Sequence, residues 1–210
     1  MTAPDYIIWK ITETEDELMS QLEHPEYFAE KIANLKAGSR RKLEVLAVRR
    51  AIKELFYGTE QHIIYDADGK PSIGKGFISI SHTDGYAAVI TSEETPVGID
   101  IERIGNRVER VVSHFLKTEE TVVLQMAAEA VADKAASSLN LLYHLAWSAK
   151  ESAYKVLGRD YYDLKNRTSI VAVDWEVRYI LLQAEGKEKP LRISFDFTDD
   201  YVLTFIQLAQ

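Results

Sequence analysis

Two acidic residues alternate with branched apolar ones in the run Val97-Gly98-Ile99-Asp100-Ile101-Glu102. Alternate residues of a strand point to the same face, so we expect Asp100 and Glu102 to project together while Ile99 and Ile101 face a core. Mg²⁺ commonly takes one or two protein carboxylates and completes its octahedron with water and phosphate oxygens. The pair therefore indicates a site for a hard cation, although the same pattern also fits the solvated face of an edge strand.

A second group of residues that could bind a metal ion or act in catalysis lies between Trp147 and Lys155. Spacings of four place Trp147, Glu151 and Lys155 on one face of a helix. A half-buried carboxylate beside a lysine can act as a metal ligand and general base. The alternative is a surface ion pair, which would contribute only about 0.2–1 kcal/mol.

Ser81 and His82 end a predicted strand, just before a turn. Both side chains can donate hydrogen bonds to phosphate oxygens, and both can equally cap a hairpin. Neighbouring strand residues point to opposite faces, so these two do not form part of a catalytic triad.

Basic residues are concentrated in one part of an acidic chain. The net charge is −8, which argues against general nucleic-acid binding, yet eight Lys and Arg residues between positions 31 and 53 stand against Glu44 alone. Such a segment suits a small, multiply phosphorylated ligand, because close contacts depend on nearby charge. It also fits a solvated helix face that carries long cationic side chains.

The elements that must position these residues form an α+β pattern. The segment from Ser39 to Tyr57 is predicted to be a helix with Ser39 as N-cap and Gly58 as its stop. A hairpin is expected from two strands, 77–82 and 86–92, joined by a turn at Thr83, Asp84 and Gly85, with a further strand at 97–101. The other expected elements are helices at 16–22, 26–35, 115–136 and 141–157, and strands at 171–180 and 191–208.

A faint internal repeat points to two similar halves. Ser79, Thr83, Asp84 and Tyr86 recur, each 115 residues later, as Ser194, Thr198, Asp199 and Tyr201. Four matches can also arise by chance, since hairpins reuse turn residues.

The composition limits the remaining classes of protein. The chain has 210 residues and no cysteine, which excludes disulfides, thiolate metal sites and cysteine nucleophiles and fits a reducing cytoplasm. The N-terminus lacks a signal-peptide core, and no stretch approaches the roughly 20 apolar residues of a membrane span. We therefore expect a soluble intracellular protein.

Taken together, the motifs resemble those of the 4′-phosphopantetheinyl transferase family, in its longer, monomeric, surfactin-synthetase-activating-like type. The resemblance covers roughly residues 39–158. The matching runs are Gly69-Lys70-Pro71, Ile80-Ser81-His82, Val97 to Glu102, Phe115-Leu116-Lys117-Thr118-Glu119 and Trp147 to Lys155.

The resemblance implies an α+β fold of two pseudo-twofold-related halves, each a small antiparallel sheet packed against helices. Residues 1–104 would carry the basic segment and the Asp-x-Glu strand, and residues 105–210 the helix with the Trp-x-x-Lys-Glu-Ser motif. The implied activity is that of a holo-[acyl-carrier-protein] synthase, which moves phosphopantetheine from coenzyme A to a serine of an apo acyl or peptidyl carrier protein. Adenosine 3′,5′-bisphosphate would be released, and neither nucleic acid nor a membrane would be a partner.

The resemblance also implies roles at individual positions. Asp100, Glu102 and Glu151 would bind Mg²⁺, Glu151 or a water held by it would deprotonate the serine, and Lys155 would neutralise the pyrophosphate. Glu119 matches an acidic family position. The residues expected to contact coenzyme A are Arg40 or Arg41 at the 3′-phosphate, a choice that depends on a shift of one residue in the match, with Arg49 nearby, and Lys70, Ser81, His82, Asp100, Lys150 and Lys155.

Two other functions are also compatible with these residues. A non-catalytic module could bind coenzyme A or a carrier protein, although binding alone requires no general base. A metal-dependent phosphohydrolase would also use clustered acids, but such sites usually need more ligands, often histidines. The stretch from Ala127 to Leu141 is longer and richer in alanine than the family pattern, so the surface that meets the carrier could differ.

Overall fold

A computed structural model describes residues 5–130 and 138–208 of the chain. Its backbone is a mixture of helices and antiparallel strands, which form two compact units. The first unit extends to Ile101 and includes Gln207, and the second extends from Glu102 to Ile206.

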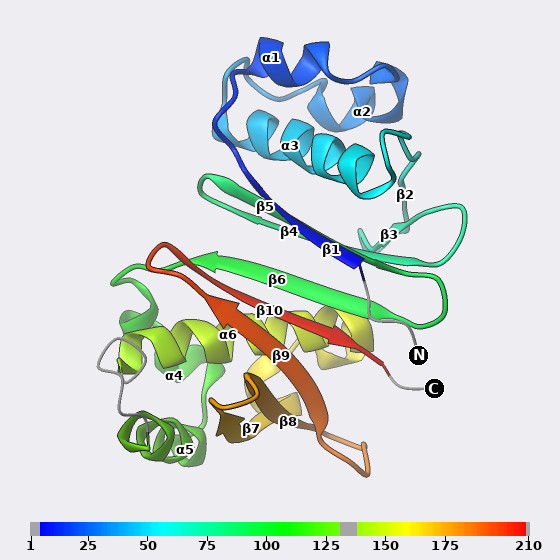
Figure 1. The fold of residues 1–210 in the computed structure, drawn as a ribbon. Coiled ribbons are helices and arrows are strands. Elements are labelled where there is room, and N and C mark those ends of the chain that lie inside the picture. Colours follow the sequence, from blue (N-terminus) through cyan, green and yellow to red (C-terminus); the bar gives the residue numbers. More distant parts are fainter. Residues whose placement is uncertain (1–4, 131–137, 209–210) are drawn as a thin grey trace. The chain divides into compact units, whose positions relative to one another are not determined.

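The first unit is a small sheet covered by helices. The sheet has the order β1-β5-β4, with β1 (Asp5–Lys10) and β4 (Phe77–Thr83) both antiparallel to β5 (Tyr86–Ser92). Helix α3 (Arg40–Leu55) packs against all three strands (Figure 1). The smaller elements of this unit are α1 (Glu15–Ser20), the 3₁₀ turn η1 (Pro25–Tyr27), α2 (Ala29–Ile32), β2 (Ile64–Tyr65) and β3 (Pro71–Ser72).

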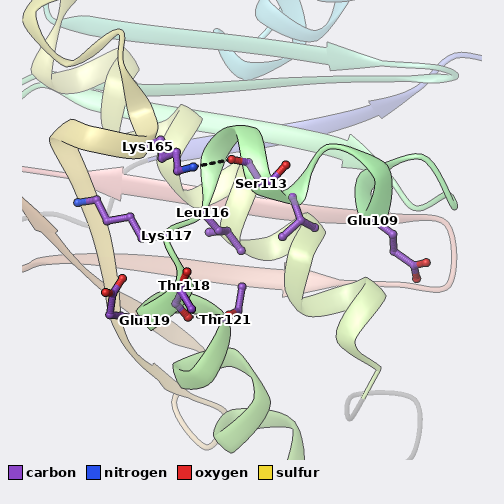
Figure 2. Close-up of a pocket in the computed structure, with 9 residues that line it drawn as sticks. Glu109, Ser113, Leu116, Lys117, Thr118, Glu119, Thr121 and Lys165 are labelled. Carbon is purple, nitrogen blue, oxygen red and sulfur yellow. Dashed lines mark hydrogen bonds between the residues drawn. The ribbon is translucent and has the colours of Figure 1, made fainter.

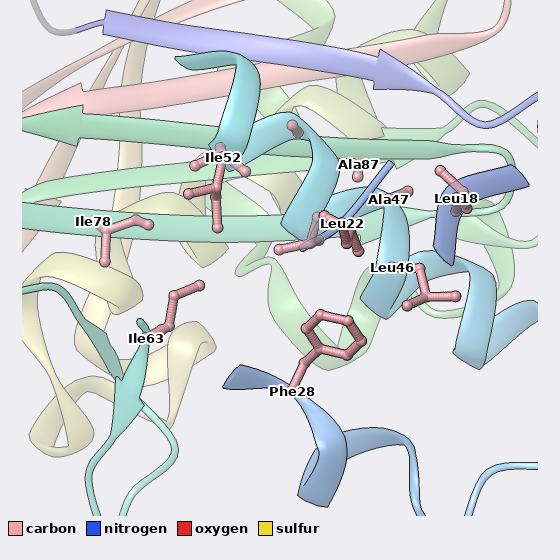
Figure 3. Packing of buried hydrophobic residues seen from close by; sticks show 12 residues of the cluster. Leu18, Leu22, Phe28, Leu46, Ala47, Ile52, Ile63, Ile78 and Ala87 are labelled. Carbon is pink, nitrogen blue, oxygen red and sulfur yellow. The ribbon is translucent and has the colours of Figure 1, made fainter. Parts of the chain in front are cut away.

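Helix α3 begins where the sequence predicts. The hydroxyl of Ser39 accepts a hydrogen bond from the backbone N–H of Lys42 at 3.3 Å, which caps the helix. Leu46 and Ala47 are fully buried and join Phe28 and Ile52 in the core of this unit (Figure 3). Burying a leucine contributes about 1.5–3 kcal/mol, so this face of α3 holds the helix on the sheet.

The hairpin of β4 and β5 is confirmed, with Thr83 paired to Tyr86 across the turn. Gly85 has a φ of +82°, a conformation that glycine adopts without steric cost. Strand β1 was not anticipated from the sequence, and the expected helix at 26–35 is divided between η1 and α2.

Strand β6 (Val97–Arg103) carries the Asp-x-Glu pair. Ile99 and Ile101 are buried as expected, but Asp100 is buried as well, with only 4% of its surface exposed. The unit boundary falls between Ile101 and Glu102. The alternative prediction, that this pair lies on the solvated face of an edge strand, is therefore wrong for Asp100.

The second unit has a larger antiparallel sheet and four helices among its described residues. The sheet order is β6-β10-β9-β8-β7, and the part of β6 in this unit is its carboxyl end. The other strands are β7 (Thr168–Asp174), β8 (Tyr179–Ala184), β9 (Leu191–Phe197) and β10 (Tyr201–Gln207). The helices are α4 (Val112–Phe115), α5 (Thr118–Glu129), α6 (Leu139–Leu157) and α7 (Leu164–Arg167), with 3₁₀ turns η2 (Val108–Arg110) and η3 (Arg159–Tyr161).

Helix α6 is attached to the sheet by hydroxyl groups as well as apolar contacts. The hydroxyl of Ser152 donates to the carbonyl oxygen of Thr204 on β10 at 3.0 Å. Ser148 and Thr204 also share a hydrogen bond of 2.9 Å between their hydroxyls. All three residues are fully buried, so these bonds fix the rotation of α6 about its axis.

Two expected elements of this unit are wrong in their extent. The single helix predicted at 115–136 is interrupted at Leu116, because the carboxylate of Glu120 accepts from the backbone N–H of Lys117 and starts α5 there. The single strand predicted at 171–180 is two strands, because the Asp174 side chain accepts from the N–H groups of Glu176 and Val177 and forms a turn.

The stretch from Ala127 to Leu141 is described only in part. Residues 131–137 of it lie outside the described residues. None of the helices in the described part of the chain combines the length and apolar character needed to cross a membrane.

Candidate active site

Most residues of helix α6 are buried, and the partly exposed positions in its middle follow one stripe. From Leu141 to Val156 the partly exposed residues are Tyr143, Trp147, Glu151, Tyr154 and Lys155. They recur every three or four residues and so lie on one side of the helix. The structure thus presents the predicted Trp-Glu-Lys group on the face of α6 that solvent can reach.

Trp147 also holds one of the two β6 carboxylates. Its indole N–H donates to Oε1 of Glu102 at 2.9 Å. The indole ring packs edge-on against Phe115, with ring centroids 5.2 Å apart. Since Glu151 follows Trp147 by one helical turn, the Glu102 carboxylate is fixed beside the stripe that carries Glu151.

Lys150 is placed where it cannot contact a ligand, so its predicted role in coenzyme A binding is not retained. Its side chain is fully buried, and its ammonium lies 2.8 Å from Glu120 Oε1. It also donates to the carbonyl oxygens of Phe115 at 2.8 Å and Thr168 at 3.2 Å. Burial lowers the pKa of Lys150, and the bond to Glu120 opposes that effect. Lys150 therefore joins α4, α5 and β7 to α6.

Glu120, the neighbour of Glu119, is a buried residue that the sequence motifs do not single out. Glu120 is 2% exposed, and besides Lys150 it accepts from the backbone N–H of Ile170 at 2.8 Å. The one local signal for Glu120 is its place three residues after Lys117, the N-cap of α5, where a glutamate can accept from the N-cap backbone N–H.

In the first unit, Ser81 and Asp100 are joined. The Ser81 hydroxyl donates to Oδ1 of Asp100 at 2.7 Å, and both side chains are buried. Ser79, two residues earlier on the same face of β4, accepts from the N–H of Ile99 at 3.2 Å. This face of β4 therefore orients the first carboxylate of β6.

His82 points to the opposite side of β4, toward α3, as the alternation of a strand predicts. Its Nδ1 lies 3.1 Å from Oε2 of Glu44, and its ring also contacts Arg41. Glu44 is 4% exposed and is paired with Arg40 at 3.2 Å and Arg41 at 3.3 Å. The Glu44 carboxylate thus holds Arg40, Arg41 and His82 together at the start of α3. The side chain of Arg40 is 69% exposed and that of Arg41 is 52% exposed.

In the sequence, Glu44 is the one acidic residue of the basic segment from Lys31 to Lys53. Its spacing of four from Arg40 was a signal for this pairing. Lys70 is exposed in the turn between β2 and β3, and its backbone N–H donates to Asp66. Arg49 lies eight residues beyond Arg41 on α3, about 12 Å along the helix axis.

The carboxylates expected to bind a metal ion are divided between the two units. Asp100 belongs to the first unit, and Glu102 and Glu151 belong to the second. Within residues 5–130 and 138–208, no three His, Asp or Glu side chains lie close enough together to form a metal site. The chemistry of the donors nevertheless fits Mg²⁺, because all three are carboxylates. Ser81 orients the Asp100 carboxylate by one hydrogen bond, and Trp147 orients the Glu102 carboxylate by another.

A pocket of about 520 Å³ lies on the second unit between α4, α5 and α7 (Figure 2). Glu119 lines it together with Lys117 and Lys165, and the Lys165 ammonium donates to the carbonyl oxygen of Ser113 at 2.7 Å. Its lining mixes both signs of charge and assigns no ligand by itself.

The partly exposed stripe of α6 that carries Glu151 and Lys155 thus lies beside the Glu102 carboxylate that Trp147 orients. Comparison with known families gives the class. Residues 96–206 match the model of the 4′-phosphopantetheinyl transferase superfamily, and the chain belongs to that superfamily.

A relative of known name supports the same assignment. The chain is 28% identical over 166 residues to the 4′-phosphopantetheinyl transferase gsp of Aneurinibacillus migulanus. The aligned region covers 76% of this chain and 64% of the relative. The chain therefore matches a little less than two thirds of that protein's length.

Proposed function

We propose that this chain transfers the 4′-phosphopantetheine arm of coenzyme A to a serine of an apo acyl or peptidyl carrier protein. The observation that carries the proposal is the accessible stripe of α6, in which Glu151 and Lys155 follow the tryptophan that holds Glu102. Membership of the superfamily and the name of the relative support the same reaction.

In the proposed reaction, the carboxylate of Glu151, or a water held by it, takes the proton of the carrier serine. The serine oxygen then forms a bond to the phosphorus of the pantetheine phosphate. The bond from that phosphorus to the bridging pyrophosphate oxygen breaks, and adenosine 3′,5′-bisphosphate leaves with the electron pair. Such a displacement needs positioning and charge stabilisation more than covalent catalysis, so one base and a set of cations suffice.

The remaining residues bind and orient coenzyme A in this proposal. Lys155, one turn beyond Glu151, would neutralise charge on the pyrophosphate. Arg40, Arg41 and His82, gathered by Glu44, would contact the 3′-phosphate. Lys70 would contact the nucleotide from its exposed turn.

Asp100, Glu102 and Glu151 would hold Mg²⁺, which when bound neutralises the pyrophosphate. The proposal also includes the architecture of two related halves, 1–104 and 105–210. Its support is that β4–β5 and β9–β10 are both hairpins, and Thr198 bonds to Tyr201 where Thr83 pairs with Tyr86. A monomer in a reducing cytoplasm completes the proposal, because two fused halves require no partner copy and the chain has no cysteine.

The test is incubation of the protein with coenzyme A, Mg²⁺ and a panel of apo carrier proteins, followed by intact-mass measurement of each carrier. We expect a gain of one phosphopantetheine on at least one carrier. A carrier with its serine replaced by alanine is the control and should gain nothing. If every carrier stays unmodified while coenzyme A binds, the non-catalytic binding module is the better description. Release of inorganic phosphate from coenzyme A without carrier modification would instead indicate a phosphohydrolase.

The variant Trp147→Phe should show the effect of losing the hydrogen bond that orients Glu102 while the packing against Phe115 is kept. Phenylalanine keeps an aromatic ring against Phe115 but removes the N–H that donates to Glu102. Loss of such a supporting bond typically weakens metal binding about 10–100-fold. We therefore expect the Mg²⁺ concentration for half-maximal transfer to rise by about this factor while the melting temperature changes little. An unchanged Mg²⁺ requirement would contradict the role given to Glu102.

A further inference from the structure

Arg49 is a buried cation for which the described residues supply no ion-pair partner. Only 5% of its surface is exposed. Its Nε and one terminal guanidinium nitrogen have no hydrogen-bond partner among the described residues. Buried polar groups are nearly always hydrogen-bonded, and a buried charge left unpaired is costly. The guanidinium therefore has the hydrogen-bonding capacity to hold a ligand.

The same side chain lines a pocket in the first unit. The pocket has a volume of about 590 Å³ and lies between η1, α2, α3 and β2. Arg49 reaches it from α3, and Lys31 and Tyr65 line it as well. It is ample for a small polyatomic ion and its hydration shell.

Lys31 adds a second positive charge to this pocket. Its ammonium lies 3.4 Å from the centre of the Tyr65 ring. Lys31 is exposed to solvent, and the limited burial of its ammonium lowers its pKa, as do the charges of Arg49 and Arg41. Burial also lowers the pKa of Arg49, an effect that the Tyr65 phenol opposes. The two cations thus repel each other, and an anion between them would relieve both the repulsion and the missing hydrogen bonds.

The acidic residues at the pocket do not neutralise these cations. The Glu26 carboxylate lies 2.9 Å from Nδ1 of His24, and Glu30, like Lys31, is exposed to solvent, where its charge is screened, whereas Arg49 is buried. Arg49 also differs from its neighbour Arg50, which is paired with Glu54 at 2.9 Å and Gln21 at 2.8 Å.

We propose that this pocket binds a phosphate oxyanion between the guanidinium of Arg49 and the ammonium of Lys31. A guanidinium presents a planar fork of donors that matches phosphate oxygens, and an ammonium adds a compact charge. The ion can be free phosphate or a phosphate group carried by a larger molecule. The site lies about two helical turns from the arginines that the proposed function gives to coenzyme A, and it does not depend on that function.

Calorimetric titration of the full chain with inorganic phosphate, at constant ionic strength, tests the proposal. We expect saturable binding and a rise in melting temperature, whereas acetate should produce neither. Arg49→Met should weaken phosphate binding about 30-fold or more, because it removes one partner of a buried charge pair. Arg50→Met is the matched control and should keep the phosphate affinity.

The stability of Arg49→Met without phosphate separates a binding role from a structural one. Removing an unpaired buried charge should leave the melting temperature equal to or above that of the unchanged protein. A marked fall in melting temperature, retention of phosphate binding by the variant, or equal binding of acetate would each overturn the proposal.

Repeating the phosphate titration on protein saturated with coenzyme A identifies the source of the anion. Loss of phosphate binding would show that a phosphate of coenzyme A fills the pocket. Unchanged binding would show a site for a free ion or another phosphorylated molecule. Both outcomes mean that the pocket binds phosphate. The phosphate titration does not depend on carrier modification, so a failure of that reaction would not change its result.

Discussion

Replacing Lys150 by methionine is expected to destabilise the protein by about 3–5 kcal/mol, the range found when one partner of a buried ion pair is removed. The ammonium is fully buried and pairs with Glu120 while donating to the backbone of Phe115 and Thr168. Methionine has a similar volume but no donor, so the Glu120 carboxylate and these carbonyl oxygens would lose a partner inside the core. Urea unfolding followed by circular dichroism measures the change.

Two further variants show whether the pairing is responsible. The double variant Lys150→Met with Glu120→Gln should recover part of the lost stability, because it leaves no unpaired charge. Lys187→Met changes an exposed lysine and should alter stability by less than about 0.5 kcal/mol. A loss for Lys150→Met as small as that of Lys187→Met would show that the buried pair contributes little.

Glu151→Gln is expected to lower the rate of carrier modification about 10²–10⁴-fold, the range typical of a lost general base. Glutamine has nearly the same shape, so the accessible stripe of α6 should keep its packing, but the amide cannot accept the serine proton. The measurement is the initial rate of carrier mass gain at saturating coenzyme A and Mg²⁺.

The control is a change of the same chemistry away from the stripe. Glu188→Gln lies in an exposed turn and should leave the rate unchanged. Both proteins should show the same melting temperature as the unchanged chain. If Glu151→Gln transfers phosphopantetheine at the full rate, another group takes the serine proton and the assignment of Glu151 is wrong.

Helix α3 shows how much of the basic segment around Arg40, Arg41 and Arg49 can be predicted from local sequence pattern. Its N-cap, its buried face and its basic character follow from the order of residues, since a capping serine and a 3.6-residue period act within one element. The pattern could not distinguish Arg40 and Arg41, which Glu44 holds at the surface, from Arg49, which is buried. That difference depends on β4, α2 and β2, elements that reach α3 only after folding.

The lengths of elements were predicted less well than their types. Strand β7 ends where the Asp174 side chain accepts backbone hydrogen bonds, and α5 begins where Glu120 does so. Turn and capping residues compete locally with the regular element, and hydrophobic period alone does not detect this competition.

The amino-acid sequence by itself determined which residue types are available for chemistry and the order in which they occur: an Asp-x-Glu strand, a Trp-Glu-Lys helical stripe and a basic helix. The tertiary structure decided which of them a ligand can reach. Lys150 and Glu151 are adjacent in the chain, yet one is locked in the core and the other lies on the accessible stripe. The reason is that consecutive helical residues point about 100° apart, and only the packing of the neighbouring elements around α6 determines which direction remains open.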